Sequence, residues 1–203
     1  MGYGKFFVIE GIDGCGKSTL VAGLKERFEF DGYDVSQHEP YGTVFGKTLR
    51  NMCNQNYLQI TPEAISLLMY ASFMEFSDKI IKPALKKGEI VIVDRWYSST
   101  LAYQTVEMED SSFLLEVHKA AEQILPPVDR FVFLDCSYEV ANNRLYGKKK
   151  DHFELKGKYF FEEVIDIYKK SSLLNPDVCW TYDGEQTYNE VLEQVYNDLQ
   201  ELL

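Results

Sequence analysis

The residues best suited to chemistry stand close together near the N-terminus. Residues 11–18 read Gly-x-x-x-x-Gly-Lys-Ser, directly after the apolar run 6–9 and before a helical pattern. The glycines let the backbone turn tightly and aim several N–H groups at one anion, and the helix adds the positive end of its dipole. In this pattern Lys17 reaches the β- and γ-phosphates of a nucleotide, and the Ser18 hydroxyl holds Mg²⁺.

A plain Gly-rich turn is the alternative reading of this stretch. Strand, loop and helix nevertheless follow one another in the order that a phosphate-binding loop requires. Cys15 occupies a position that needs only a small side chain, so we assign it no catalytic role. The residues expected to bind the triphosphate are Gly11, Gly14, Cys15, Gly16, Lys17, Ser18 and Thr19.

A second pair of candidate residues, Asp94 and Arg95, follows the apolar run 90–93. Phosphoryl transfer asks a protein mainly for positioning and for neutralisation of charge. Asp94 has the placement of a second carboxylate on the magnesium side, although an Asp that caps a strand end is the plainer reading. Arg95 can hold a phosphate through two parallel hydrogen bonds, and its place directly after Asp94 favours this role over that of an ordinary surface arginine. We therefore expect Ser18 and Asp94 at the metal and Arg95 at a phosphate.

A third candidate is the lysine-rich segment at about residues 146–158, which has little apolar content. A run of lysines is most often a solvated loop. In a chain with a phosphate loop, a mobile lid over the transferred phosphate is favoured instead. We expect one of its lysines, with Lys149 as the candidate, to share the negative charge, although the sequence does not distinguish among Lys148, Lys149, Lys150 and Lys156.

Strand and helix patterns alternate along the chain. Strands are expected at residues 5–10, 33–39, 89–94, 130–135 and 177–182, and helices at 17–30, 45–55, 62–87, 98–125, 138–147, 158–174 and 187–203. Such alternation predicts right-handed crossovers and a parallel sheet covered on both faces. Ligands of such sheets bind beyond the carboxyl ends of the strands. This edge brings together the phosphate loop, Glu39-Pro40 and Asp94-Arg95. We therefore predict one α/β domain over residues 1–203, with the three-layer α/β/α P-loop NTPase fold, a five-stranded parallel sheet and a short lid.

Composition narrows the class of protein. The 203 residues are 45% hydrophobic and 26% charged, which is typical of a globular domain. A net charge of −11 argues against a polynucleotide partner, because such binding needs a basic face. The N-terminus shows no signal pattern, and no apolar run reaches membrane-spanning length. The four cysteines lack a metal-binding spacing and are expected to be reduced thiols in the cytoplasm.

Taken together, the chain resembles the thymidylate kinases, a family of nucleoside monophosphate kinases. The resemblance covers nearly the whole chain, in order, and Asp-Arg-x-x-x-Ser-x-x-Ala-Tyr-Gln at 94–104 is its most specific piece. The other matching pieces are residues 7–19, 39–43 with Arg50, 67–71, 81–85 and 127–135 with Arg144.

This resemblance implies transfer of the γ-phosphoryl group of ATP, with Mg²⁺, to a deoxynucleoside monophosphate, of which dTMP is the leading candidate. It also implies a homodimer. Asp13 would organise metal and phosphate, and Glu39-Pro40 would lie near the acceptor. The remaining implied roles are acceptor-phosphate binding by Arg50 and Arg95, base-edge contacts by Thr100 and Gln104, packing of Tyr103 under the sugar against a 2′-hydroxyl, and stacking of Arg144 on the donor adenine.

Two departures from the family pattern bear on the acceptor and the lid. The family's base-stacking aromatic and base-binding Arg correspond here to Met69 and Phe73, which removes a hydrogen-bond donor and adds a stacking surface. Position 14 is Gly rather than Arg, so the charge at the transferred phosphate must come from the lid, where His152 stands in place of the usual Arg.

Three alternatives to dTMP phosphorylation stay open at this point. The acceptor can be another deoxynucleotide (dUMP, dGMP or dCMP). It can be a free deoxynucleoside, which needs a carboxylate base such as Glu39 or Glu10. A protein of a different class, a nucleotide-binding switch with slow hydrolysis, is the third alternative.

Overall fold

The computed structural model describes residues 3–56, 60–147 and 152–203. Five strands form one sheet, in the order β2-β3-β1-β4-β5, and every neighbouring pair is parallel. The strands are β1 (Lys5–Glu10), β2 (Val35–His38), β3 (Ile90–Asp94), β4 (Arg130–Asp135) and β5 (Cys179–Asp183). The prediction of a five-stranded parallel sheet is confirmed. Because β1 lies in the middle, between β3 and β4, the loop that follows it opens at the centre of the sheet edge.

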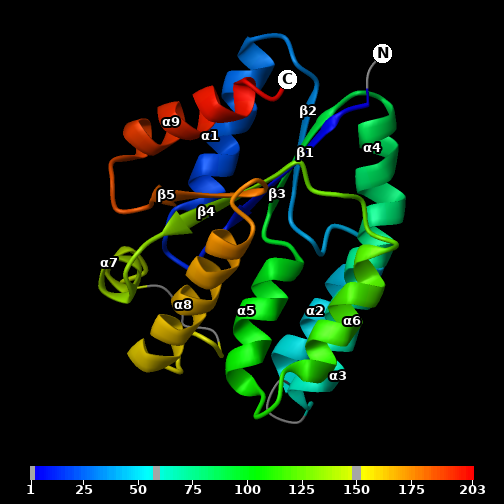
Figure 1. The fold of residues 1–203 in the computed structure, drawn as a ribbon, viewed down its shortest axis with the longest axis vertical. Helices are drawn as coiled ribbons and strands as arrows, with labels where there is room; N and C mark the ends of the chain where they lie inside the picture. Colours follow the sequence, from blue (N-terminus) through cyan, green and yellow to red (C-terminus); the bar gives the residue numbers. More distant parts are fainter. Residues whose placement is uncertain (1–2, 57–59, 148–151) are drawn as a thin grey trace.

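Helices cover both faces of the sheet, which makes three layers (Figure 1). On one face α1 (Lys17–Phe30) contacts β1, β2 and β3, and α9 (Tyr188–Gln200) packs on α1 and β5. The other helices are α2 (Val44–Asn56), α3 (Pro62–Phe76), α4 (Lys82–Lys86), α5 (Tyr97–Glu107), α6 (Ser112–Glu122), α7 (Tyr138–Arg144) and α8 (Lys158–Leu174). Of these, α4 and α8 lie on the second face of the sheet, and α5 packs between α3 and α8.

The core follows from side chains that alternate along buried strands. Phe7 and Ile9 of β1 join a cluster with Leu24 of α1 and Val195 of α9. Phe6 belongs to a second cluster on the other side, which includes residues of α3, α4 and α6. Burying one such side chain is worth about 1.5–3 kcal/mol, so the two clusters together hold the sheet edge rigid beneath the loops.

The helix predicted over 62–87 is interrupted. A π-helical turn, Ser77–Ile81 (η2), separates α3 from α4. The reason is Pro83, the second residue of α4, which has no N–H to donate to the preceding turn. The backbone widens locally and continues in the same direction.

The helix predicted over 98–125 is two helices. Between them Met108 is extended (φ −96°, ψ 141°), which ends α5. Asp110 then accepts hydrogen bonds from the backbone N–H and the hydroxyl of Ser112, at 2.8 and 2.9 Å, and so begins α6. An Asp in this position competes with continued helix, and the break follows from that competition.

None of the helices in the described ranges has the length and apolar character needed to cross a membrane.

Candidate functional site

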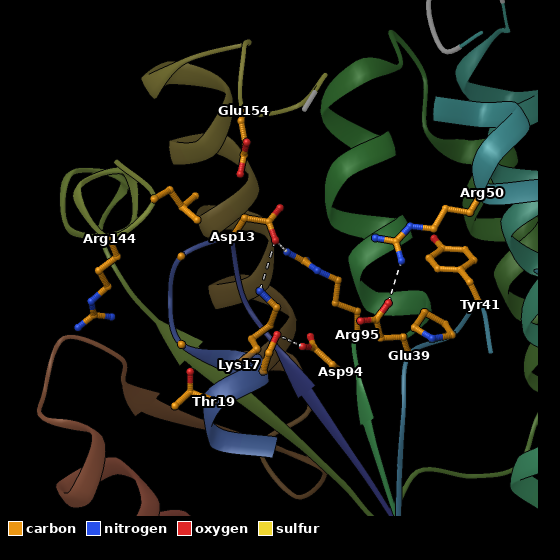
Figure 2. Close-up of a pocket in the computed structure, with 15 residues that line it drawn as sticks. Asp13, Lys17, Thr19, Glu39, Tyr41, Arg50, Asp94, Arg95, Arg144 and Glu154 are labelled. Atoms are coloured by element: carbon orange, nitrogen blue, oxygen red, sulfur yellow. Dashed lines mark hydrogen bonds and ion pairs between the residues drawn. The ribbon is translucent and has the colours of Figure 1, made fainter. Parts of the chain in front are cut away.

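A cleft of about 450 Å³ opens beyond the carboxyl ends of β1, β2 and β3. Figure 2 shows Lys17 and Asp13 near its centre, Arg144 on one side, and Glu39, Tyr41 and Arg50 on the other. The lining residues are Asp13, Gly14, Gly16, Lys17, Ser18, Thr19, Glu39, Pro40, Tyr41, Arg50, Asp94, Arg95, Arg144, Leu145 and Glu154. The three sequence segments predicted to meet at this edge do meet there.

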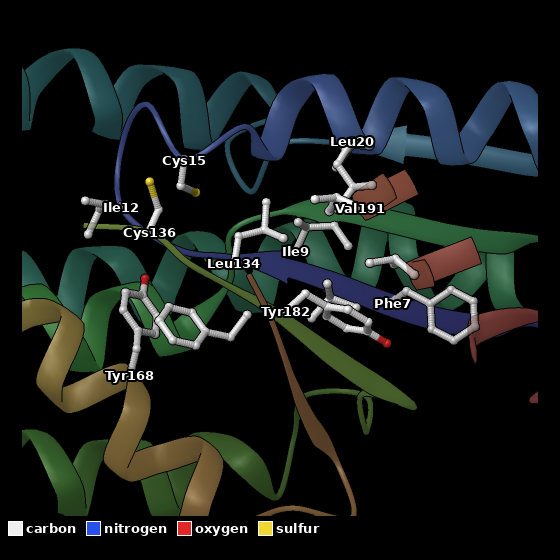
Figure 3. Packing of buried hydrophobic residues seen from close by; sticks show 14 of the residues in the cluster. Phe7, Ile9, Ile12, Cys15, Leu20, Leu134, Cys136, Tyr168, Tyr182 and Val191 are labelled. Carbon is white, nitrogen blue, oxygen red and sulfur yellow. The ribbon is translucent and has the colours of Figure 1, made fainter. Parts of the chain in front are cut away.

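The loop between β1 and α1 needs glycine for two reasons. Gly11 and Gly14 have φ of +142° and +87°, which side chains rarely adopt. A Cβ at Gly14 would also lie 2.3 Å from the carbonyl oxygen of Ala141. Below the loop, Ile12 and Cys15 turn into the core beside Leu134 (Figure 3). The loop is therefore fixed from beneath, and α1 begins at Lys17 with its N-terminus at the cleft.

Lys17 is almost completely buried, with a 5% exposed side chain. Its Nζ donates a hydrogen bond to the carbonyl oxygen of Ile12 at 2.8 Å and lies 3.7 Å from Oδ1 of Asp13. The ammonium group is thus held inside the curl of the loop, close to where the loop's N–H groups would place a phosphate.

Ser18 and Asp94 supply two oxygen ligands side by side. The hydroxyl of Ser18 donates to Oδ2 of Asp94 at 2.6 Å. Hydroxyl and carboxylate oxygens suit Mg²⁺, which usually keeps several waters and takes further ligands from substrate phosphates. The searched part of the chain contains no cluster of three or more His, Cys, Asp or Glu side chains that would bind a metal alone. Because Mg²⁺ in proteins is usually bound by one or two protein oxygens together with substrate phosphates, the pair of Ser18 and Asp94 suits a metal that arrives with a nucleotide.

Arg95 has an unusual backbone. Its φ is +75°, the one positive value among the described residues other than glycine, and its N–H donates to the carbonyl oxygen of Ile9 at 2.9 Å. One guanidinium nitrogen lies 2.5 Å from Oδ1 of Asp13, and the other terminal nitrogen donates to the hydroxyl of Ser99 at 3.1 Å. The left-handed backbone turns the arginine side chain back over the phosphate loop.

Charges in the cleft set the pKa of Asp13. Burial raises the pKa of this carboxyl group, but the positive charges of Arg95 and Lys17 outweigh burial and lower the pKa from 3.8 to about 2. Burial lowers the pKa of Arg95, and the carboxylate of Asp13 more than restores it, to well above its usual value. At neutral pH the two cations Lys17 and Arg95 therefore share the carboxylate of Asp13.

A pH dependence of stability follows. Because the pKa of Asp13 is lower in the folded chain than the unfolded value of 3.8, Asp13 stabilises the fold above pH 3.8, and this contribution disappears as the pH falls towards 2. We expect Asp13→Asn to lower the melting temperature by a constant amount between about pH 5 and 7, and by less and less below about pH 4. Melting curves for both proteins over this range test it. Parallel curves down to the acid limit would contradict it.

The opposite wall carries a second arginine. Arg50 pairs with Glu39 at 2.8 Å, and its guanidinium lies 5.0 Å from the centre of the Tyr41 ring. The hydroxyl of Tyr41 lies 3.0 Å from the sulfur of Met69. Arg50 and Arg95 thus stand on the same cleft, each next to a carboxylate, and a phosphate between them would meet two guanidinium groups.

A second, smaller cavity of about 250 Å³ continues from the phosphate loop on the side of Arg144. Arg144 donates to the carbonyl oxygens of Gly184 and Cys15, at 2.8 and 3.3 Å, and so ties α7 to the loop after β5. The cavity shares Gly16, Thr19 and Arg144 with the main cleft, and its other lining residues are Cys15, Leu20, Leu134, Gly184, Gln186, Tyr188 and Val191. Its place and lining fit a planar nucleobase.

The residues expected to meet the acceptor base lie deeper. Thr100, Tyr103 and Gln104 are buried on α5, and Met69 is half-buried on α3. The side chain of Phe73 is only 1% exposed and packs against Trp96, with ring centres 4.8 Å apart. Phe73 is therefore part of the core, whereas Met69 reaches the cleft wall through Tyr41.

The described part of segment 146–158, the predicted lid, contacts α5. Phe153 packs edge-on against Tyr103 with ring centres 4.9 Å apart, and Lys156 forms an ion pair with Glu107. Glu154 lines the cleft. Lys149, the predicted catalytic lysine, lies outside the described residues.

Tyr41, Leu145 and Glu154 also line the cleft, although they were not among the predicted site residues. All three are close in sequence to predicted site residues or to the predicted lid: Tyr41 follows Glu39-Pro40, Leu145 follows Arg144, and Glu154 lies two residues after His152.

Comparisons with known proteins agree with this architecture. The family model described as Thymidylate kinase matches residues 9–195. The chain is 33% identical to "Thymidylate kinase" of Thermosipho africanus over 195 residues, which covers 94% of each chain. It is 34% identical to "Thymidylate kinase" of Nitrosomonas europaea over 190 residues, covering 93% of this chain and 88% of that one. A "Probable thymidylate kinase" of Thermococcus onnurineus is 36% identical over 173 residues, 81% of this chain and 79% of that one.

Proposed function

The chain belongs to the thymidylate kinase family and catalyses the ATP-dependent phosphorylation of dTMP, and we propose how the residues of its cleft divide that work. The observation that supports these assignments is that positively charged side chains from both sides of the cleft meet at one carboxylate. Lys17 lies in the phosphate loop, Arg95 faces it from the end of β3, and both contact the same carboxylate, Asp13.

ATP occupies the loop side. Its β- and γ-phosphates lie on the N–H groups of residues 11–19 and on Lys17, with the adenine in the smaller cavity beside Arg144. Ser18 and Asp94, whose oxygens lie 2.6 Å apart, would hold a Mg²⁺ ion bound with ATP. The ion would neutralise the phosphate oxygens. The lid adds further positive charge, for which Lys149 remains the candidate.

The acceptor occupies the other side. Its phosphate displaces the carboxylate partners of Arg95 and Arg50, namely Asp13 and Glu39, and takes up their hydrogen bonds. The attacking group is a phosphate oxygen that is already ionised, so positioning and charge neutralisation suffice for transfer.

The acceptor's sugar and base extend towards α3 and α5. Tyr103 lies under Arg95, 5.4 Å from its guanidinium to the ring centre, where it packs under the sugar. Thr100 and Gln104 on the same helix meet the base edge, and Met69 contacts the base face beside Tyr41. Phe73, deep in the core behind them, acts through packing.

Two observations favour a monophosphate over a free nucleoside as the acceptor. Glu10 accepts hydrogen bonds at both carboxylate oxygens from Trp96, Ser98, Ser99 and Tyr168, so neither oxygen is turned to a 5′-hydroxyl. Glu39 pairs with Arg50, and that arginine suits a phosphate.

The acceptor test measures ADP release from ATP and Mg²⁺ with dTMP, dUMP, dGMP, dCMP and thymidine in turn. We expect the highest kcat/KM with dTMP, because Thr100 and Gln104 offer polar groups for a thymine edge. Turnover with thymidine and none with dTMP would remove the monophosphate assignment. Equal ADP release without any acceptor would instead favour a hydrolysing switch.

We also propose a cytoplasmic homodimer. Leu67 of α3 and Phe113 and Leu115 of α6 are large apolar side chains with 42–49% exposure, on two helices that pack against each other. Light scattering at micromolar concentration distinguishes one chain from two.

The cysteines support the cytoplasmic location that we propose. Cys15, Cys136 and Cys179 are free thiols, as a reducing compartment would keep them.

A further inference from the structure

Glu10, the last residue of β1, is a buried acidic side chain with 1% exposure. Its Oε1 accepts hydrogen bonds from the backbone N–H of Trp96 at 2.8 Å and from the hydroxyl of Ser98 at 2.5 Å. Its Oε2 accepts from the hydroxyls of Ser99 at 2.6 Å and Tyr168 at 3.0 Å. Three of these four donors belong to the segment directly after Arg95.

The network continues to the guanidinium group of Arg95. Arg95 donates to the hydroxyl of Ser99 at 3.1 Å, and that hydroxyl in turn donates to Glu10. The backbone of Arg95 is held as well, because its N–H donates to the carbonyl oxygen of Ile9. Residues 9 and 10 of β1 therefore fix Arg95 both at its main chain and through its side chain.

Burying a carboxylate at this position is unfavourable in free energy, because the charged group loses its hydration. Its four partners are neutral donors, and an apolar side chain of similar size would fill the space without any need for them. What the carboxylate adds is directional: each donor must point towards β1. This orientation maintains the left-handed backbone at Arg95 (φ +75°), a conformation that persists only when its surroundings enforce it.

We infer that Glu10 is a positioning residue for the acceptor phosphate: through Ser99 and the 96–99 backbone it holds Arg95 in the orientation that binds this phosphate. The inference rests on the proposed role of Arg95. Tyr168 of α8 completes the network from a third element, so the acceptor clamp is braced by β1, α5 and α8 together (Figure 3 shows Tyr168 on the side of the sheet away from α1).

The direct test is Glu10→Gln, which keeps the shape of the side chain. The new amide can still accept at one end, but at the other it carries N–H groups, so the hydroxyls of Ser99 and Tyr168 lose the oxygen that accepts their hydrogen bonds. We expect KM for dTMP to rise about tenfold while KM for ATP changes less than about twofold, as expected when a clamp is misplaced by a fraction of an ångström.

The control is Tyr182→Phe, which removes another buried tyrosine hydroxyl, the donor to Asp198 at 2.8 Å, without touching the network of Glu10. It should lower the melting temperature by about 2–4 °C, as the loss of one hydrogen bond does in a chain of this size, and leave both KM values unchanged. If Glu10→Gln behaves like this control, with a lower melting temperature and an unaltered KM for dTMP, Glu10 is merely structural and the inference is wrong.

A double variant separates this inference from the proposed function. If Glu10 acts through Arg95, adding Glu10→Gln to Arg95→Ala has no further effect on KM for dTMP, whereas independent effects would multiply. If Arg95→Ala alone leaves the kinetics with dTMP unchanged, the proposed role of Arg95 fails first. Should Glu10→Gln not fold, Ser99→Ala breaks the same chain of hydrogen bonds in its middle and must raise KM for dTMP in the same selective way.

Discussion

Replacing Arg95 with alanine is expected to lower kcat/KM for dTMP by at least about a hundredfold, the scale of losing one preorganised donor at a charged transition state. The two nearest candidates to replace the guanidinium group of Arg95 are held elsewhere in the cleft. Arg50 stands on the opposite wall beside Tyr41, and Lys17 is held in the phosphate loop. Steady-state ADP release at saturating ATP measures the loss, and KM for ATP should change little.

Two companion variants sharpen this prediction. Arg95→Lys keeps the charge but not the planar fork, so it should recover only part of the loss. Arg27→Ala removes an arginine of α1 that pairs with Glu193 of α9, away from the cleft, and should leave the kinetics unchanged. Wild-type turnover by Arg95→Ala would show that the acceptor phosphate binds elsewhere.

Local patterns predicted much of the fold. Strand β4 and helices α1 and α8 begin and end at the predicted residues, because β4 is a buried apolar run, α1 directly follows the Gly-rich loop, and α8 is amphipathic. The π-helical turn before Pro83 and the break at Asp110 were not predicted. Both depend on which of two competing hydrogen-bond patterns wins, and a periodicity shared by the two patterns does not reveal it.

In the site, too, features set by consecutive residues could be predicted, and features set by packing of distant residues could not. The phosphate loop could be predicted because its chemistry lies in consecutive residues. The depth of Phe73 could not, since its burial against Trp96 depends on how α3 packs over the end of β3. Glu10 was considered only as a possible base. Its four donors come from two elements distant in sequence, so its place in the network was visible only after folding.

The pairing of charges within the cleft connects the two halves of the site. Lys17 and Arg95 share Asp13, and Arg50 pairs with Glu39. In the binding mode that we propose, each phosphate replaces a carboxylate that already neutralises its cation, and only the gain over that carboxylate contributes to binding. The carboxylates also keep the buried cations oriented before substrates arrive, so little reorganisation remains for the reaction itself.

Lys17→Ala should have the largest effect of all, a loss of about a thousandfold in kcat, because the ammonium group is held inside the loop where we propose that the transferred phosphate binds. The matched control is Lys25→Ala on the same helix, where the lysine forms an exposed pair with Glu29 and should be dispensable. Removing Lys17 also leaves Asp13 with one cation fewer, so the pKa of Asp13 should rise above about 2 while the protein still melts cooperatively. Turnover that survives in Lys17→Ala, with the pKa of Asp13 raised as expected, would mean that the loop's N–H groups and Arg95 stabilise the transferred phosphate without the lysine.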